Sequence, residues 1–327
     1  MALSLNSSNS SQQSQNRENE KTHTFKQFDV VSDYSDHHYY TKKKENKGTC
    51  FINCDSKVHK HIMKEWRILA KNLPENIYVR VYDTRFDPLR AAIVGAAGTP
   101  YHDGLFFFDV KFPHDHPTRP PKVYFRSYNL RLHPHLFSSG TVCLNLLNSH
   151  IFWNKWHPSQ STILQVLVSL QGLVLKENPF YDALGNRGNM KKVPQESNNN
   201  VFVATCQMTL FLLGIPPKNF ETFIIDHFRE RGNMIRVGLH KVSRNFKQLL
   251  AQLYPLLIEE FRMIGLDGEF RTIGACNVVE HSIPPKAKKP NSIKVFNKLG
   301  KILGLKKGNK KKNVDTCASD LNTIQSS

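Results

Sequence analysis

The sequence contains little cysteine, and it lacks the paired spacings on which metal sites and disulfide frameworks depend. Its six cysteines are scattered over 327 residues, with no Cys-x-x-Cys pair and no cysteine–histidine spacing typical of a zinc site. Cys50 and Cys54 lack a matching second pair, so we expect no structural metal. Scattered thiols of this kind indicate a reduced, intracellular protein.

Long apolar runs are also missing. The longest apolar stretch, residues 163–175, is interrupted by Gln165, Ser169 and Gln171 and is too short to span a bilayer. The N-terminal stretch MALSLNSSNSSQQSQNRENE is polar and has no apolar signal region. We therefore expect a soluble protein of the cytoplasm, the nucleus or both, neither secreted nor membrane-spanning.

Acidic residues are absent from part of the C-terminal region. The formal net charge is +18, and residues 286–312 hold eleven lysines but no acid. Such a tail favours contact with polyanions. For its amphipathic stretch at 292–307, the first interpretation is a solvated tail or a signal for an import receptor. Contact with an anionic membrane is the second, and nucleic-acid binding is the third. Binding to a calmodulin-like groove is a further option.

The rest of the chain has enough apolar side chain for a core, with 39% hydrophobic residues and 21 phenylalanines. Residues 1–55 are polar and are predicted to be disordered. Apolar residues at helical spacing then predict a helix capped by Asp55 or Ser56. Alternation follows and predicts four strands at 77–83, 90–96, 104–112 and 122–126. Their short connections favour an antiparallel meander.

Later elements are helical. Residues 112–121 hold four prolines and predict a rigid irregular link. A helix with a capping serine is predicted at 161–178, and two more follow at 199–213 and 217–264, the last broken near Gly232 or Gly238. The sequence thus predicts an α+β fold. Its expected units are a polar N-terminal region (1–55), a core (56–190), a helical extension (191–270) and a basic tail (271–327).

Four stretches appear in an order that resembles the catalytic core of ubiquitin-conjugating enzymes, over residues 57–190. They are PYHDGLFFFDVKFP, HPTRPPKVYF, LHPHLFSSGTVCLNLL and WHPSQSTILQVLVSLQGLVL. In the second, His116 stands where the family has the tyrosine of Tyr-Pro-x-x-Pro-Pro. The long gap between Cys143 and Trp156, the NPFYD segment and residues 209–232 resemble the large plant-type branch of that family.

The resemblance implies that Cys143 accepts ubiquitin's C-terminal carboxyl from an activating enzyme and passes it to a lysine of a substrate protein, with or through a ligase. ATP is used by the activating enzyme, so no cofactor is implied here. The chemistry agrees, because thioester exchange needs a sulfur that is both nucleophile and leaving group. Taken alone, Cys143 would be interpreted as a small buried apolar residue, as most free cysteines are, and the surrounding stretches reverse that interpretation. A catalytically weak module that binds ubiquitin or a ligase, and transfer of a ubiquitin-like modifier, stay open.

His135 is a departure from the family pattern. The family's turn is His-Pro-Asn, with the asparagine eight residues before the cysteine, and here that position is His135. The asparagine is thought to stabilise the oxyanion of transfer or to hold the loop. An imidazole N–H can partly replace it and would make transfer pH-sensitive, or His135 is a loop residue and activity is lower. His133 and Pro134 are expected to set the turn.

The remaining site residues follow from the resemblance by position. Asp182, followed by Ala183, replaces the family's acid near the incoming lysine, either as a displaced stand-in or as a solvated loop residue. Thr118 stands in place of an apolar ligase anchor, and Trp156 braces the following loop. The expected contacts with the activating enzyme and ligase are Lys64, Arg67, Thr118, Pro158 and Ser159.

Overall fold

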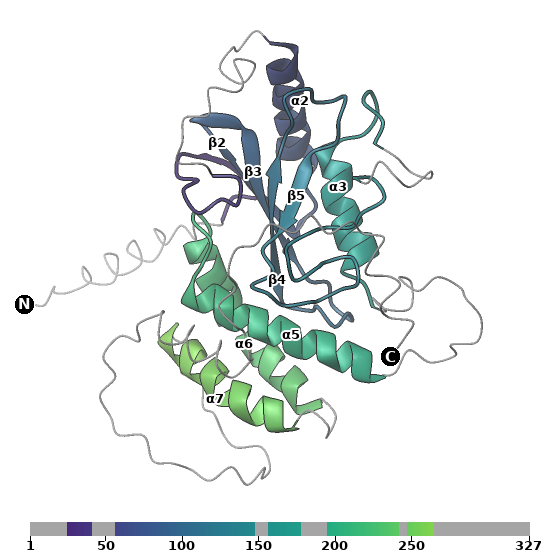
Figure 1. Ribbon diagram of the computed structural model, residues 1–327. Helices are drawn as coiled ribbons and strands as arrows, with labels where there is room; N and C mark the ends of the chain where they lie inside the picture. Colours follow the sequence, from purple (N-terminus) through teal and green to yellow (C-terminus); the bar gives the residue numbers. More distant parts are fainter. Residues whose placement is uncertain (1–24, 41–55, 148–155, 178–194, 242–246, 265–327) are drawn as a thin grey trace, which may run out of the picture.

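The computed structural model of the chain describes residues 25–40, 56–147, 156–177, 195–241 and 247–264 (Figure 1). Helix α2, Lys57–Asn72, begins as the sequence predicts, because the Ser56 hydroxyl accepts a hydrogen bond from the His59 backbone N–H at 3.1 Å. Its inward face carries Ile62, Glu65 and Leu69, all buried. A carboxyl group on this face is unusual, because acidic side chains are rarely fully buried unless they are paired.

The antiparallel meander is present, and the sheet has one strand more than predicted. Strands β2 (Ile77–Tyr82), β3 (Arg85–Val94), β4 (Leu105–Lys111) and β5 (Lys122–Phe125) pair antiparallel in chain order. Strand β1, Phe28–Val31, pairs parallel with β2. The prediction of disorder for 1–55 is therefore wrong for residues 25–40. The polar composition concealed a short strand whose partner lies about fifty residues away.

Successive residues of a strand point to opposite faces. One face of this sheet is covered by the residues on either side of β1, such as Phe25 and Asp36, and by residues 220–223. The Phe107 ring lies 5.1 Å from the Phe220 ring, and Tyr78 lies 4.3 Å from Phe223. The Arg80 guanidinium lies 4.0 Å from the centroid of the Phe25 ring. Both faces of the sheet are therefore removed from water, which explains the nearly continuous burial of β2, β3 and β4.

A buried ion-pair network holds residues 25–40 on that face. Arg90 on β3 and Asp109 on β4, both fully buried, pair across the strands with Nε and Oδ1 2.7 Å apart. A second guanidinium nitrogen of Arg90 donates to the Asp36 carboxylate at 2.8 Å. Asp36 also accepts from the backbone N–H of Lys218 at 3.2 Å, and the Lys218 side chain pairs with Asp33. The N-terminal segment is thus fixed both to the sheet and to the C-terminal helices.

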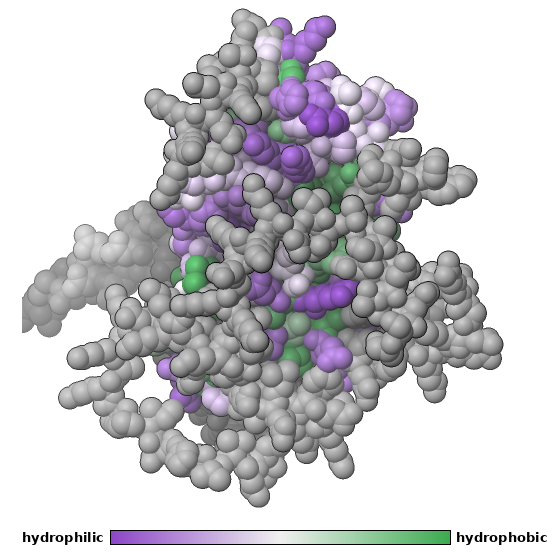
Figure 2. All heavy atoms as spheres, in the orientation of Figure 1, coloured by the Kyte–Doolittle hydropathy of each residue, from purple (hydrophilic) through white to green (hydrophobic). Residues whose placement is uncertain are grey.

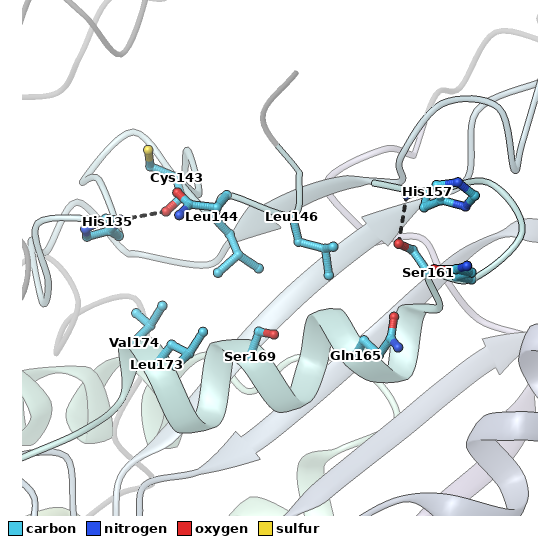
Figure 3. Close-up of a pocket in the computed structure, with 12 residues that line it drawn as sticks. His135, Cys143, Leu144, Leu146, His157, Ser161, Gln165, Ser169, Leu173 and Val174 are labelled. Atoms are coloured by element: carbon cyan, nitrogen blue, oxygen red, sulfur yellow. Dashed lines mark hydrogen bonds between the residues drawn. The ribbon is translucent and has the colours of Figure 1, made fainter. Parts of the chain in front are cut away.

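The cross-helix differs in detail from its prediction. Helix α3, Ile163–Ser169, is capped by Thr162 in a capping box with Gln165, rather than by a serine. It continues as a π-helical turn, η1, over Leu170–Val174. Helix α2 contacts α3 and β3. The π turn widens the helix at the end that lies near the cysteine-bearing segment (Figure 3).

Three further helices follow: α5 (Gln195–Gly214), α6 (Glu221–Lys241) and α7 (Lys247–Met263). They lie together at one end of the sheet (Figure 1). The predicted break near Gly232 or Gly238 is wrong, because α6 runs through both glycines to Lys241. Of the other predicted units, the tail 271–327 and its amphipathic stretch lie outside the described residues. Hydrophilic side chains gather over the opposite end, around α2 (Figure 2).

Candidate active site

The segment that carries Cys143 is irregular but closely bonded to the sheet. Isolated bridges join Thr141 to Tyr124 of β5, and Val142 to Leu136. Gly140 before them has φ +88°, and a Cβ there would lie 2.1 Å from the Tyr124 ring. Only glycine fits this turn, and the turn directs the chain from β5 toward the cysteine.

His135 and Cys143 are joined by two hydrogen bonds. The Cys143 backbone N–H donates to the His135 carbonyl at 2.9 Å, and the His135 ring Nδ1 lies 2.8 Å from the Cys143 carbonyl oxygen (Figure 3). The His135 backbone N–H in turn donates to Nδ1 of His133 at 2.9 Å. The His-Pro-His turn therefore fixes the main chain of Cys143 through His135, while His133 bonds within the turn itself.

Cys143 is half-buried and lines a pocket of about 470 Å³ between its own segment and the cross-helix. Gln165, Ser169 and Leu173 recur every four residues along α3 and η1 and line the opposite wall (Figure 3). The Leu173 side chain is 60% exposed at this wall. The rest of the lining comes from His135, Leu144, Asn145, Leu146, His157, Gln160, Ser161 and Val174. Cys143 therefore borders an open depression rather than a closed core, and its sulfur points away from the cross-helix (Figure 3).

No charged side chain of the described residues lines this pocket. The lining residues that titrate are Cys143, His135 and His157. The other described cysteine, Cys206, is 1% exposed, and burial strongly raises the pKa of its thiol. Cys143 is thus the described cysteine that a macromolecular substrate can reach.

The residues expected to contact the ligase and activating enzyme lie on elements that are bonded to one another. Lys64 and Arg67 are exposed on α2, Thr118 is exposed on the proline-rich link, and Pro158 with Ser159 are exposed beyond Trp156. Trp156 Nε1 donates to the Pro117 carbonyl at 2.6 Å and ties the link to the loop. Trp156 is partly buried, which agrees with its expected role as a brace.

A buried acid and a buried histidine lie beneath this surface. Glu65 on α2 accepts from the Ile163 backbone N–H, at the start of α3, and its other oxygen is 4.0 Å from His116 Nε2. Burial raises the pKa of Glu65 to about 7 and lowers that of His116 to about 4. Lys64 favours the charged form of Glu65. His61 lowers the pKa of His116, and Asp115 raises it.

Comparison with known proteins gives consistent results. A family model described as "Ubiquitin-conjugating enzyme" matches residues 61–202. Putative ubiquitin-conjugating enzyme E2 38 of Arabidopsis thaliana is 37% identical over 276 residues, covering 74% of this chain and 82% of that protein. Probable ubiquitin-conjugating enzymes E2 24 and E2 25 of the same plant are 40% and 45% identical, covering 74% and 62% of this chain. The chain belongs to the ubiquitin-conjugating enzyme family.

The relatives differ in length. This chain covers 29% of the length of E2 24 and 34% of that of E2 25. This chain thus spans about a third of the length of these two relatives.

Sequence reasoning missed several pocket residues. His157, Gln160 and the row Gln165, Ser169 and Leu173 line the Cys143 pocket and were not among the predicted site residues. The four-residue spacing of Gln165, Ser169 and Leu173 was the pattern in the sequence that could have placed these three on one face of the cross-helix. Asp182 lies outside the described residues, so the structure does not place it.

The described residues contain no group of three or more histidine, cysteine, aspartate or glutamate side chains arranged to hold a metal ion. Within the same part of the chain, no helix is both long enough and apolar enough to cross a membrane.

Proposed function

We propose that this chain accepts ubiquitin as a thioester on Cys143 and transfers it to a lysine of a substrate protein. The Cys143 thiolate attacks the carbonyl carbon of the thioester on the activating enzyme, whose own thiolate leaves. The lysine amine then attacks the new thioester, an isopeptide bond forms, the Cys143 thiolate leaves and the amine loses a proton.

One observation carries the proposal. In a chain of this family, Cys143 is half-buried and lines a pocket, and its main chain is held by His135 through both backbone and side chain. A fixed backbone with an accessible sulfur is what repeated thioester exchange requires. Burial makes Cys206 unsuitable for the same role.

The exposed residues of α2, of the proline-rich link and of the loop after Trp156 indicate the partners of the chain. The activating enzyme meets Lys64 and Arg67 on α2, and a ligase meets Thr118, Pro158 and Ser159, all of them exposed. Thr118 is a small polar residue where an apolar anchor is usual, so docking of a ligase of the ordinary RING type is weakened. ATP is consumed upstream, on the activating enzyme.

The test is a non-reducing gel after the full chain is mixed with activating enzyme, ATP and ubiquitin. A thiol-sensitive adduct is expected for the natural chain and for Cys206→Ala, and none for Cys143→Ala. Cys206→Ala is the matched control, because it removes a described cysteine that is not exposed. An adduct that survives Cys143→Ala would falsify the assignment. No adduct with ubiquitin, while the chain still binds ubiquitin or a ligase, would favour the non-catalytic module.

A further inference from the structure

The side-chain bond between His135 and Cys143 determines which ring nitrogen carries the proton. A carbonyl oxygen only accepts hydrogen bonds, so Nδ1 of His135, 2.8 Å from the Cys143 oxygen, must donate. The neutral ring is therefore the Nδ1–H tautomer, and its Nε2 carries a lone pair. A neutral His135 has one N–H, and that N–H is already used.

Asparagine, which the family pattern has at this position, differs in the number of its donors. Its amide has two N–H bonds, so one can hold the carbonyl while the other remains available. A neutral imidazole offers one, and only the imidazolium offers a second. The difference concerns transfer, because an oxyanion forms when the lysine attacks the thioester.

We propose that His135 is a positioning residue that fixes the main chain of Cys143 through its Nδ1–H, and that its neutral ring therefore has no N–H left for the oxyanion of transfer. The second half of the proposal rests on the proposed function. The first half concerns only the folded chain and is tested without ubiquitin.

The surroundings of His135 make its charge state matter. The titratable groups that face it are His133, whose ring lies 5.1 Å away, and Cys143, and His157 lines the same pocket. No carboxylate of the described residues lines the pocket. Protonation of His135 therefore adds a positive charge next to the Cys143 main chain, in a pocket that no carboxylate of the described residues lines. The Nδ1–H bond to Cys143 persists in both forms, because both forms keep that proton.

The first experiment measures how fast iodoacetamide alkylates Cys143, by mass spectrometry of its peptide, between about pH 6 and about pH 9. We compare the natural chain with His135→Asn and His135→Leu, with thermal melting to confirm folding. His135→Leu loses the clamp, so its rate should differ several-fold at every pH. His135→Asn keeps a donor, so its alkylation rate should equal that of the natural chain at high pH. Its rate should lack the change with pH that charging of the imidazole causes in the natural chain. Equal rates and profiles for all three chains would overturn the clamp.

The second experiment follows discharge of a preformed ubiquitin thioester to free lysine. The ratio of the His135→Asn rate to the natural rate should rise with pH and reach about tenfold or more where the imidazole is neutral, since one missing oxyanion donor costs roughly 10²–10³ in rate. A ratio that stays near one at all pH values would overturn the second half. If no thioester forms at all, the proposed function fails, and the alkylation experiment still decides the clamp.

Discussion

The carboxylate of Glu65 on α2 accepts a hydrogen bond from the backbone N–H of Ile163 at 3.0 Å and so joins the first helix to the beginning of the cross-helix. These residues are far apart in the chain, and Glu65 is 6% exposed. A buried acid at this junction gives the fold a dependence on pH.

Glu65→Gln should stabilise the chain at high pH. Burial raises the pKa of Glu65 from 4.5 to about 7, so the folded state holds the proton more tightly than the unfolded state. Stability is therefore lost as pH rises from 4.5 to about 7, and the penalty is complete above that range. Glutamine keeps the acceptor for Ile163 without the charge. We expect a gain of roughly 1–3 kcal/mol near pH 8 and little change near pH 5.

Urea unfolding at both pH values checks this. Glu75→Gln is the matched control, because Glu75 is exposed just before β2, and it should change neither value appreciably. A loss of stability in Glu65→Gln at high pH would show that the charge itself is needed at the junction.

Gly140→Ala should destabilise the fold and displace the cysteine-bearing segment. The new Cβ meets both a left-handed φ of +88° and the Tyr124 ring at 2.1 Å. We expect a cost of about 3 kcal/mol or more, the sum of backbone strain and overpacking. Gly98→Ala separates the two effects, because Gly98 has φ +80° and nothing within 4 Å of its added Cβ. It should cost only about 1–2 kcal/mol in thermal melting and leave Cys143 reactivity unchanged.

Asp109→Asn should be among the more damaging single changes. Burial alone would raise the pKa of Asp109, but Arg90 and its other cationic neighbours outweigh it and lower the pKa to about 2. This stability is present above pH 3.8 and is lost as pH falls toward 2. Removing the charge leaves the buried Arg90 with Asp36 as its remaining carboxylate partner, at a cost of about 3–5 kcal/mol.

The matched comparison is Asp226→Asn, which breaks the exposed pair with Arg229 on α6. Denaturant unfolding should show about 0–1 kcal/mol for that change. Equal costs for the two substitutions would contradict the importance assigned to the buried pair.

Charge reversal on α2 should slow charging without touching the cysteine. Lys64→Glu with Arg67→Glu opposes docking of the activating enzyme, so the KM for that enzyme should rise several-fold. Iodoacetamide should still alkylate Cys143 at the natural rate. Lys71→Glu, in the last turn of the same helix, serves as control. An unchanged KM in the double variant would place the docking surface elsewhere.

Local patterns predicted much of the fold. Alternation located β2 to β5, and helical spacing with Ser56 located α2. Strand β1 was not predicted because its four residues carry no alternating pattern of their own, and they pair with β2, about fifty residues away in the chain. The break in α6 was predicted wrongly because Gly232 lowers helix propensity, whereas in the structure it lies buried within the packed helix.

Part of the site could also be predicted from the sequence, and part could not. The position of Cys143 after the His-Pro-His turn was readable from the sequence, and the structure brings His135 and Cys143 together. The far wall of the pocket was not readable, because which row of α3 and η1 faces the cysteine depends on how that helix packs. Glu65 was hidden among apolar positions of α2, since its partner at Ile163 is set by tertiary packing alone.

The cover over the second face of the sheet has a practical consequence for anyone who shortens this protein. The stretch matched by the family, 61–202, excludes β1 and α6 and ends inside α5. A fragment trimmed to those limits would present Phe107 and Arg90 to water, with their covers Phe220 and Asp36 cut away. The stretch matched by the family and the packed unit therefore have different borders, and an expression fragment should run from residue 25 to residue 264.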